Sequence, residues 1–300
     1  MAKSAYQCLL EGLLSDGYNA MGIPGDCLQY QKLNPGEDPI IEFFKIHDFL
    51  DEFIKDYIKK VAPSLYDPNA RLEFINYGDT QLVFVLSTNG KKYSLLITQN
   101  AAPLGITKQE FDNLNTLANI CPSVIVKPEY YFTFWGKELY IAPYIEQARC
   151  IASQDTGYGI YVPEPFYRFE LFNDEERKNV NICMIANLIR LYNEELNQGL
   201  GSCKIGGGDF ILEKSWDKSD KSLETTLKKM KLIAARELIT MSFDNYQEQL
   251  FYDFSNRTYY SDIKDRDAAY LINHKNRVPM TEEEITKGIE YGKCLRKTRV

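Results

Sequence analysis

The stretch Lys204-Ile205-Gly206-Gly207-Gly208-Asp209-Phe210-Ile211-Leu212 places three glycines directly before an acid and an apolar run. Consecutive glycines predict a tight turn, and the apolar run predicts a short buried strand. A second segment, Leu250-Phe251-Tyr252-Asp253-Phe254-Ser255, has a similar pattern, an apolar strand that ends in an acid. Because two acids at neighbouring strand ends can share one divalent cation, the sequence predicts Asp209 and Asp253 as metal ligands.

Each of these motifs also has a purely structural interpretation. The three glycines can form only a turn that requires positive φ, followed by a core strand. Asp253 can be a turn acid that accepts hydrogen bonds from backbone amides. The sequence leaves both interpretations open.

Composition limits the classes of function. The chain has 300 residues, 44% of them hydrophobic and 26% charged, as in ordinary soluble globular proteins. Its net charge of −7 argues against broad binding to nucleic acid. Several basic residues do crowd the C-terminus, and we interpret them as a solvated helix end that complements the helix dipole. They are Lys287, Lys293, Arg296, Lys297 and Arg299.

Cysteine, histidine and apolar runs indicate a compartment. The seven cysteines are scattered, and there are only two histidines, so neither a disulfide framework nor a zinc site is expected. No apolar run reaches the roughly 20 residues that span a bilayer, and the N-terminus lacks a signal-peptide cleavage site. We therefore expect a reducing, cytoplasmic location with no membrane association.

The first half of the chain predicts a helix followed by an antiparallel sheet. Residues 40–61 carry an apolar stripe at helical spacing. From Leu72 to Ile97 apolar and polar residues alternate, and Asn89-Gly90 is a strong hairpin signal. Thr107 and Glu110 form a capping-box pattern for a helix. Strands are then predicted at 124–126 and 139–141, on either side of an aromatic hairpin over 130–135.

The second half predicts mostly helices. An irregular segment from Pro143 to Pro165 is the expected boundary between two lobes. Helices are predicted from Asn173 or Asp174 through Leu196, from Leu223 to Met241, and from Thr281 onward; short strands are predicted at 250–252 and 258–260. These patterns give an α+β fold with an N-terminal helical extension (1–66), an antiparallel-sheet lobe with one helix (67–145) and a mainly helical lobe (146–300).

This order of elements resembles the protein-kinase-like fold, especially its aminoglycoside and choline phosphotransferase branch, over residues 70–260. Residues 74–85 look like the first two strands and the nucleotide-covering turn, and Glu110 lies in the helix that supplies the family's ion-pair glutamate. Leu139-Tyr140-Ile141-Ala142-Pro143-Tyr144-Ile145 looks like the hinge strand. Gly208-Asp209 and Tyr252-Asp253-Phe254 look like the two metal-ligand motifs.

The resemblance implies a site for ATP with Mg²⁺ or Mn²⁺ between the lobes, near Leu82 and Ala142. Two departures argue against catalysis. The third strand, Tyr93-Ser94-Leu95-Leu96-Ile97, has leucine where the family carries a phosphate-binding lysine or arginine. The catalytic aspartate expected five residues before Asp209 is replaced by Lys204, which could instead act as a substitute phosphate clamp.

Three hypotheses for function follow. The first is a pseudokinase that binds a nucleotide and a metal and acts mainly through binding. The second is a non-enzymatic interaction or assembly component, for example of a virus particle, with a protein partner or self-assembly. The third is an active phosphotransferase with an unrecognised base, for which Asp262, Asp265 and Asp267 offer carboxylates.

Overall fold

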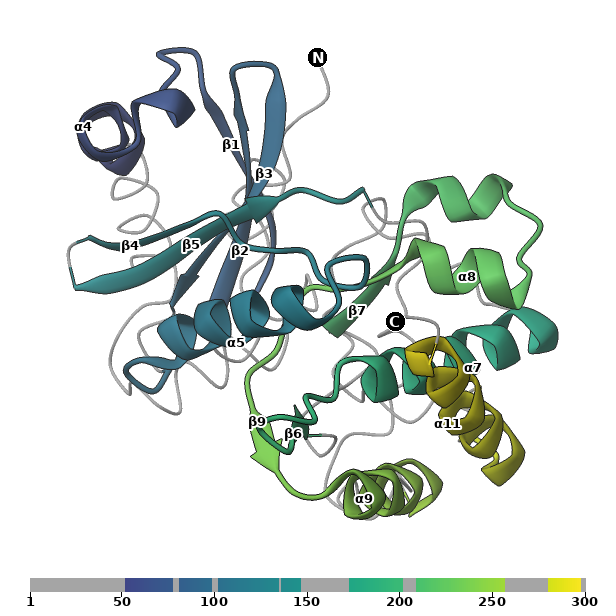
Figure 1. Ribbon diagram of the computed structural model, residues 1–300. Helices are drawn as coiled ribbons and strands as arrows, with labels where there is room; N and C mark the ends of the chain where they lie inside the picture. Colours follow the sequence, from purple (N-terminus) through teal and green to yellow (C-terminus); the bar gives the residue numbers. More distant parts are fainter. Residues whose placement is uncertain are drawn as a thin grey trace, which may run out of the picture. The chain divides into compact units, whose positions relative to one another are not determined.

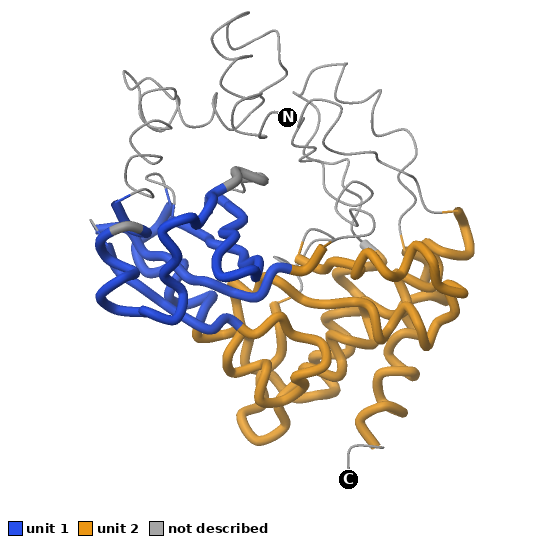
Figure 2. Tube along the Cα trace, turned by 90° about the horizontal axis from the view of Figure 1, so that it is seen from above, with its two compact units in different colours: residues 1–111, 128–144, 160–168 blue, residues 112–127, 145–159, 169–300 orange. Residues whose placement is uncertain are grey.

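A computed structural model of the chain describes residues 52–77, 81–98, 102–134, 136–146, 173–201, 209–256 and 280–297 (Figure 1). The chain forms two compact units (Figure 2): one of residues 1–111, 128–144 and 160–168, the other of residues 112–127, 145–159 and 169–300. The first contains an antiparallel sheet and the second is mainly helical, so the predicted α+β class is confirmed. The two units are not contiguous in sequence, unlike the predicted division.

The first unit is built on a five-stranded antiparallel sheet. Its strands are β1 (Arg71–Tyr77), β2 (Gln81–Thr88), β3 (Lys91–Thr98), β4 (Tyr130–Phe134) and β5 (Lys137–Pro143), in the order β1-β2-β3-β5-β4. Asn89 and Gly90 have φ of 49° and 73°, the left-handed pair that a two-residue hairpin turn requires. The alternation and the Asn-Gly signal therefore predicted these hairpins correctly.

One face of this sheet packs against the segment that precedes β1. That segment contains η1 (Phe53–Ile58), α4 (Lys59–Val61) and η2 (Pro63–Leu65). Phe53 is fully buried, with its ring centroid 5.5 Å from that of Phe132 and 5.4 Å from that of Phe134. The described part of the predicted 1–66 extension is thus part of the sheet core, because its apolar stripe supplies the second layer that the sheet face needs.

The other face meets the start of helix α5 (Ile106–Ile120). The predicted capping box is wrong, since α5 begins before Thr107. The Thr107 hydroxyl instead accepts a hydrogen bond from the Gln81 amide at 3.2 Å and is bonded to the Thr98 hydroxyl at 2.6 Å. Thr107 is fully buried, so its hydroxyl satisfies strand side chains rather than a helix end.

The helical unit is centred on α7 (Asp174–Arg190). Asn173 caps this helix as predicted: its side chain accepts from the Glu176 amide at 2.9 Å, and the Glu176 carboxylate accepts from the Asn173 amide at 3.1 Å. The helix ends at Arg190, earlier than predicted. Every residue from Val180 to Ile189 is buried, so α7 is the central helix of this unit.

Helix α11 (Glu282–Lys297) packs against α7 (Figure 1). Its predicted cap is confirmed: the Thr281 hydroxyl accepts from the Glu284 amide at 3.2 Å, and the Thr281 amide donates to the Glu284 carboxylate at 2.9 Å. Gly288 and Gly292 lie against the backbone of α7 and are buried.

Two short strand pairs complete the unit. Strand β6 (Gln198–Leu200) pairs with β9 (Leu238–Thr240), and β7 (Phe210–Leu212) pairs with β8 (Met230–Leu232), both antiparallel. Between β7 and β8 lie η5 (Lys214–Lys218) and α8 (Leu223–Lys229). The helix predicted over 223–241 is therefore wrong beyond Lys229, because Met230 and Leu232 bury alternate side chains as a strand does.

Helix α9 (Phe243–Asn256) occupies the segment predicted to be a strand at 250–252. Tyr246, Leu250 and Phe254 are buried and recur at helical spacing, so the apolar run belongs to an amphipathic helix. The predicted strand at 258–260 lies outside the described residues. None of the helices in the described ranges is long and apolar enough to cross a membrane.

Candidate functional site

Asp209 directly precedes β7, as predicted, and its surroundings are set by the strand pair. Its carbonyl oxygen accepts a hydrogen bond from the Ile233 amide at 2.8 Å, so the segment after β8 runs beside it. That segment, residues 233–237, continues to β9, where the Glu237 carbonyl accepts from the Gly201 amide at 3.0 Å. Residues 233–237 thus link β8 to β9. They are hydrogen-bonded at one end to Asp209, just before β7, and at the other end to Gly201, just after β6.

Asp253 does not lie at the end of a strand. It is in α9, where its carboxylate accepts a hydrogen bond from the Gln249 amide one turn earlier at 2.7 Å. The strand that pairs with β7 is β8, and the residues that follow β8 are Ile233-Ala234-Ala235, with no acid. The strand-end geometry from which Asp253 was predicted as a second metal ligand is therefore wrong.

The acids, histidines and cysteines that the structure describes form no group of three or more that could hold a metal ion. Lys204 and the glycines Gly206–Gly208, predicted to lie at the same site, fall outside the described residues. Metal binding by Asp209 and Asp253 accordingly stays a prediction.

Leu82 and Ala142, predicted to line a nucleotide site, lie on opposite faces of the sheet. Leu82 pairs with Ile97 of β3, whereas Ala142 pairs with Ser94 of the same strand. Ser94 and Ile97 are an odd number of residues apart, so their side chains, and those of their partners, point to opposite faces. Leu82 is part of the core cluster that contains Phe53, so its side chain is committed to packing. Ala142 shares the α5 face of the sheet with Tyr140.

On that α5 face, Glu110 is fully buried and accepts a hydrogen bond from the Tyr140 hydroxyl at 3.1 Å. The resemblance assigns this helix position to an ion pair with a lysine of the third strand. Strand β3 has lysines only at its exposed first two positions, Lys91 and Lys92. A phenol from β5 is thus one partner of the glutamate, and it ties α5 to the sheet.

A second polar group lies at the start of α5. The Tyr131 hydroxyl donates to the Glu138 carboxylate at 3.0 Å, and the Lys108 amide donates to the same carboxylate at 3.3 Å. The Lys108 ammonium lies 5.3 Å from the centre of the Tyr131 ring. Burial raises the pKa of Tyr131, so the phenol stays neutral and acts as a hydrogen-bond donor.

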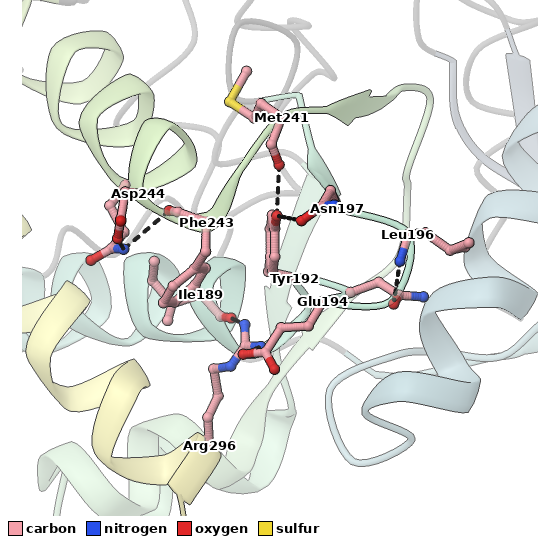
Figure 3. Close-up of polar contacts among 11 residues, drawn as sticks. Ile189, Tyr192, Glu194, Leu196, Asn197, Met241, Phe243, Asp244 and Arg296 are labelled. Carbon is pink, nitrogen blue, oxygen red and sulfur yellow. Dashed lines mark hydrogen bonds and ion pairs between the residues drawn. The ribbon is translucent and has the colours of Figure 1, made fainter.

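One cation of the helical unit with several partners was missed from the sequence. Arg296 of α11 donates to the Ile189 carbonyl at 2.8 Å and to the Glu194 carboxylate at 2.5 Å (Figure 3). Its guanidinium lies 4.6 Å from the ring centre of Phe243 and 5.5 Å from that of Tyr192. Interpreting the C-terminal basic residues as solvated is therefore wrong for Arg296. A usable signal was the recurrence of Gly288, Gly292 and Arg296 on one helix face.

Comparison with known proteins gives a fold-level likeness only. No protein-family model matches the sequence, and no curated protein matches it. Solved structures that resemble the chain include the crystal structure of the BubR1 kinase domain, with a TM-score of 0.40 and 16% sequence identity. The match covers 60% of this chain and 50% of that one.

Proposed function

We propose that this chain is a kinase-like protein that acts by binding and not by phosphoryl transfer. Its order of elements supports the kinase-like scaffold: a five-stranded antiparallel sheet with a helix between β3 and β4, then a long helix, then a strand pair that begins at Asp209. Membership of the aminoglycoside and choline phosphotransferase branch stays a prediction.

The observation that carries the proposal is the pairing of β7 with β8. Phosphoryl transfer by kinases relies on metal ions held by two separate motifs and on a base that orients the nucleophile. Here the strand that pairs with β7 is β8, Met230-Lys231-Leu232, which carries no acid of the kind that a second metal-ligand motif supplies. Lys204 stands where the base is expected, and a protonated lysine can neither accept the nucleophile's proton as a carboxylate does nor bind a cation.

The ligand we propose is a nucleotide such as ATP, with Lys204 in contact with its phosphates. A cation at this position compensates phosphate charge without a metal ion, as lysines do in phosphate sites. Mg²⁺ or Mn²⁺ bound to the phosphates and to Asp209 would add to that affinity. Thermal unfolding with ATP in MgCl2, MnCl2 or EDTA separates the two contributions.

ATP at 100 times its Kd is expected to stabilise the protein by roughly 2.7 kcal/mol. We expect most of this shift to persist in EDTA and to be lost in Lys204→Ala. Lys218→Ala is the matched control, since it removes an exposed lysine of η5. No thermal shift at millimolar ATP would overturn nucleotide binding, and transfer of the γ-phosphate above a protein-free control would overturn the non-catalytic assignment.

A role as a protein-interaction or assembly component is the second candidate. The insertion between β7 and β8 favours this role, because it has its own packed core. Trp216 is fully buried there, and its indole donates to the Thr226 hydroxyl at 3.0 Å. Most of the surface residues that this insertion carries are charged, among them Lys214, Asp217 and Lys218. Light scattering coupled to size exclusion discriminates: a monomer that binds ATP supports the first candidate, and a self-assembling species the second.

A further inference from the structure

Arg296 connects helix α11 to three other segments of the helical unit. It binds the last turn of α7 through the Ile189 carbonyl, the loop after α7 through Glu194, and the start of α9 through the Phe243 ring (Figure 3). Its side chain is only 14% exposed, so its hydrogen bond to the Ile189 carbonyl is partly shielded from water, whereas the Glu194 side chain is 70% exposed. Partly buried charge-assisted hydrogen bonds are stronger than exposed ion pairs.

The position of Arg296 is fixed by the packing of α11. Gly288, Gly292 and Arg296 recur on one face of the helix, and the two glycines lie against α7. A Cβ on Gly292 would lie 2.8 Å from the Ala186 carbonyl oxygen and 2.7 Å from the Ile189 Cβ. Helix α11 therefore cannot shift toward α7, and the guanidinium is held one turn beyond the close contact.

Tyr192, which Arg296 contacts, also makes hydrogen bonds that hold the β6–β9 pair in place. The Tyr192 hydroxyl donates to the Met241 carbonyl at 2.6 Å, and the Met241 amide donates to the Asn197 carbonyl at 2.8 Å. These bonds join the loop before β6 to the residue that follows β9. Leu200 then pairs with Leu238, and the Gly201 amide donates to the Glu237 carbonyl. An unbroken chain of contacts thus leads from Arg296 to the residues that border the glycine stretch.

We propose that Arg296 is a positioning residue that makes α11 a latch on the β6–β9 pair. When α11 is docked, Arg296 orders Tyr192 and the loop over 191–197, and this loop aligns β6. When the contact is lost, β6 and β9 separate more readily, although α7 and the sheet unit stay folded. The functional consequence rests on the proposed function, because Gly201 and Asp209 flank the segment that contains Lys204.

Hydrogen–deuterium exchange of the full-length protein without nucleotide tests the latch. In Arg296→Ala we expect amides of 192–201 and 237–243 to exchange about tenfold faster or more, the change that corresponds to loss of one charge-assisted hydrogen bond. Amides of β2 and β3 should keep their wild-type rates. Unchanged exchange at 192–201 and 237–243, or equal acceleration across β2 and β3, would overturn the latch.

Two further variants separate the contacts of Arg296 from its charge. Lys297→Ala removes a positive charge from an exposed position in the same last turn, so a dipole effect alone would accelerate exchange in it as well. We expect wild-type rates there. Arg296→Lys keeps the charge but loses the planar fork, so we expect faster exchange in the same two segments; wild-type rates in this variant would also overturn the proposal.

The affinity for ATP gives a separate result. Under the latch, Arg296→Ala should weaken ATP binding, whereas Lys297→Ala should not. If the wild-type protein does not bind ATP at all, the nucleotide proposal fails, but the exchange measurements still decide whether α11 controls the β6–β9 pair. Failure of the two proposals is therefore distinguishable.

Discussion

Replacing Gly292 by alanine should destabilise the helical unit, although alanine is the better helix former. In an isolated helix this substitution is favourable by about 1 kcal/mol. In the folded protein the new Cβ would lie 2.8 Å from the Ala186 carbonyl oxygen and 2.7 Å from the Ile189 Cβ. These are backbone and Cβ atoms, which no change of rotamer can move away.

The magnitude follows from these two opposing effects. To restore van der Waals distances of about 3.5 Å, α11 must move away from α7, and its neighbours lose part of their dispersion energy. Overpacking of this kind costs about 1–3 kcal/mol. Because the fully buried Ile285 lies on the same helix and loses contacts as well, we expect the cost to exceed the gain in propensity. The net result should be a loss of up to about 2 kcal/mol in the free energy of unfolding.

Urea unfolding followed by tryptophan fluorescence measures this effect. The chain has two tryptophans, and a Trp135→Phe background leaves the buried Trp216 of the helical unit as the only reporter. Thr286→Ala, at an exposed position of α11, is the control and should stabilise slightly through helix propensity. In a peptide of residues 280–300, Gly292→Ala should raise helicity measured by circular dichroism. A protein variant as stable as its parent, or more stable, would refute the close-packing argument.

Three other predictions follow from single contacts. Asn173→Ala removes the cap of α7 and should lower the free energy of unfolding by about 1 kcal/mol, measured in urea. In Gly90→Ala the new Cβ meets no atom within 4 Å, but the residue must keep a φ near +73°. We expect a loss of about 1 kcal/mol in thermal stability, which would report backbone strain alone. Burial raises the pKa of Tyr246, so above the unfolded-state pKa of about 10 the unfolded chain ionises first and stability falls by up to about 1.4 kcal/mol per pH unit. In Tyr246→Phe this slope should be shallower; an unchanged slope in alkaline urea titrations would contradict the assignment.

The sheet was predictable because its signals are local. Alternating apolar residues from Leu72 to Ile97 define the buried face, and Asn89-Gly90 fixes the register of the first described hairpin turn. The helix caps at Asn173 and Thr281 were predictable for the same reason, since each requires only residues within one turn.

The errors fall where a short apolar run fits either a helix or a strand. Leu250-Phe251-Tyr252 is too short to show its period, and only Tyr246 and Phe254 reveal that it belongs to a helix. Asp253 was assigned to a strand end for this reason. The converse error is the helix predicted beyond Lys229. That segment forms β8 because Met230 and Leu232 pair with β7, and no local pattern predicts a contact with a segment so far away in sequence.

The candidate site was less predictable than the fold. Asp209 was placed correctly before a strand, but its neighbour Ile233 depends on which distant segment pairs with β7. Leu82 was assigned by analogy to a nucleotide site, and the structure places it in the core cluster that contains Phe53. Arg296 looked like a solvated tail residue, since its partners Ile189, Glu194 and Phe243 are far away in sequence.

The two strand pairs of the helical unit are nested, and nesting has a kinetic consequence. Strands β7 and β8 lie between β6 and β9 along the chain. Closing the inner pair first shortens the effective loop that the outer pair must close, which lowers its entropic cost. Since η5 and α8 can form locally and bring β7 and β8 together, we expect refolding to proceed from the inside outward, with β6 and β9 joining last.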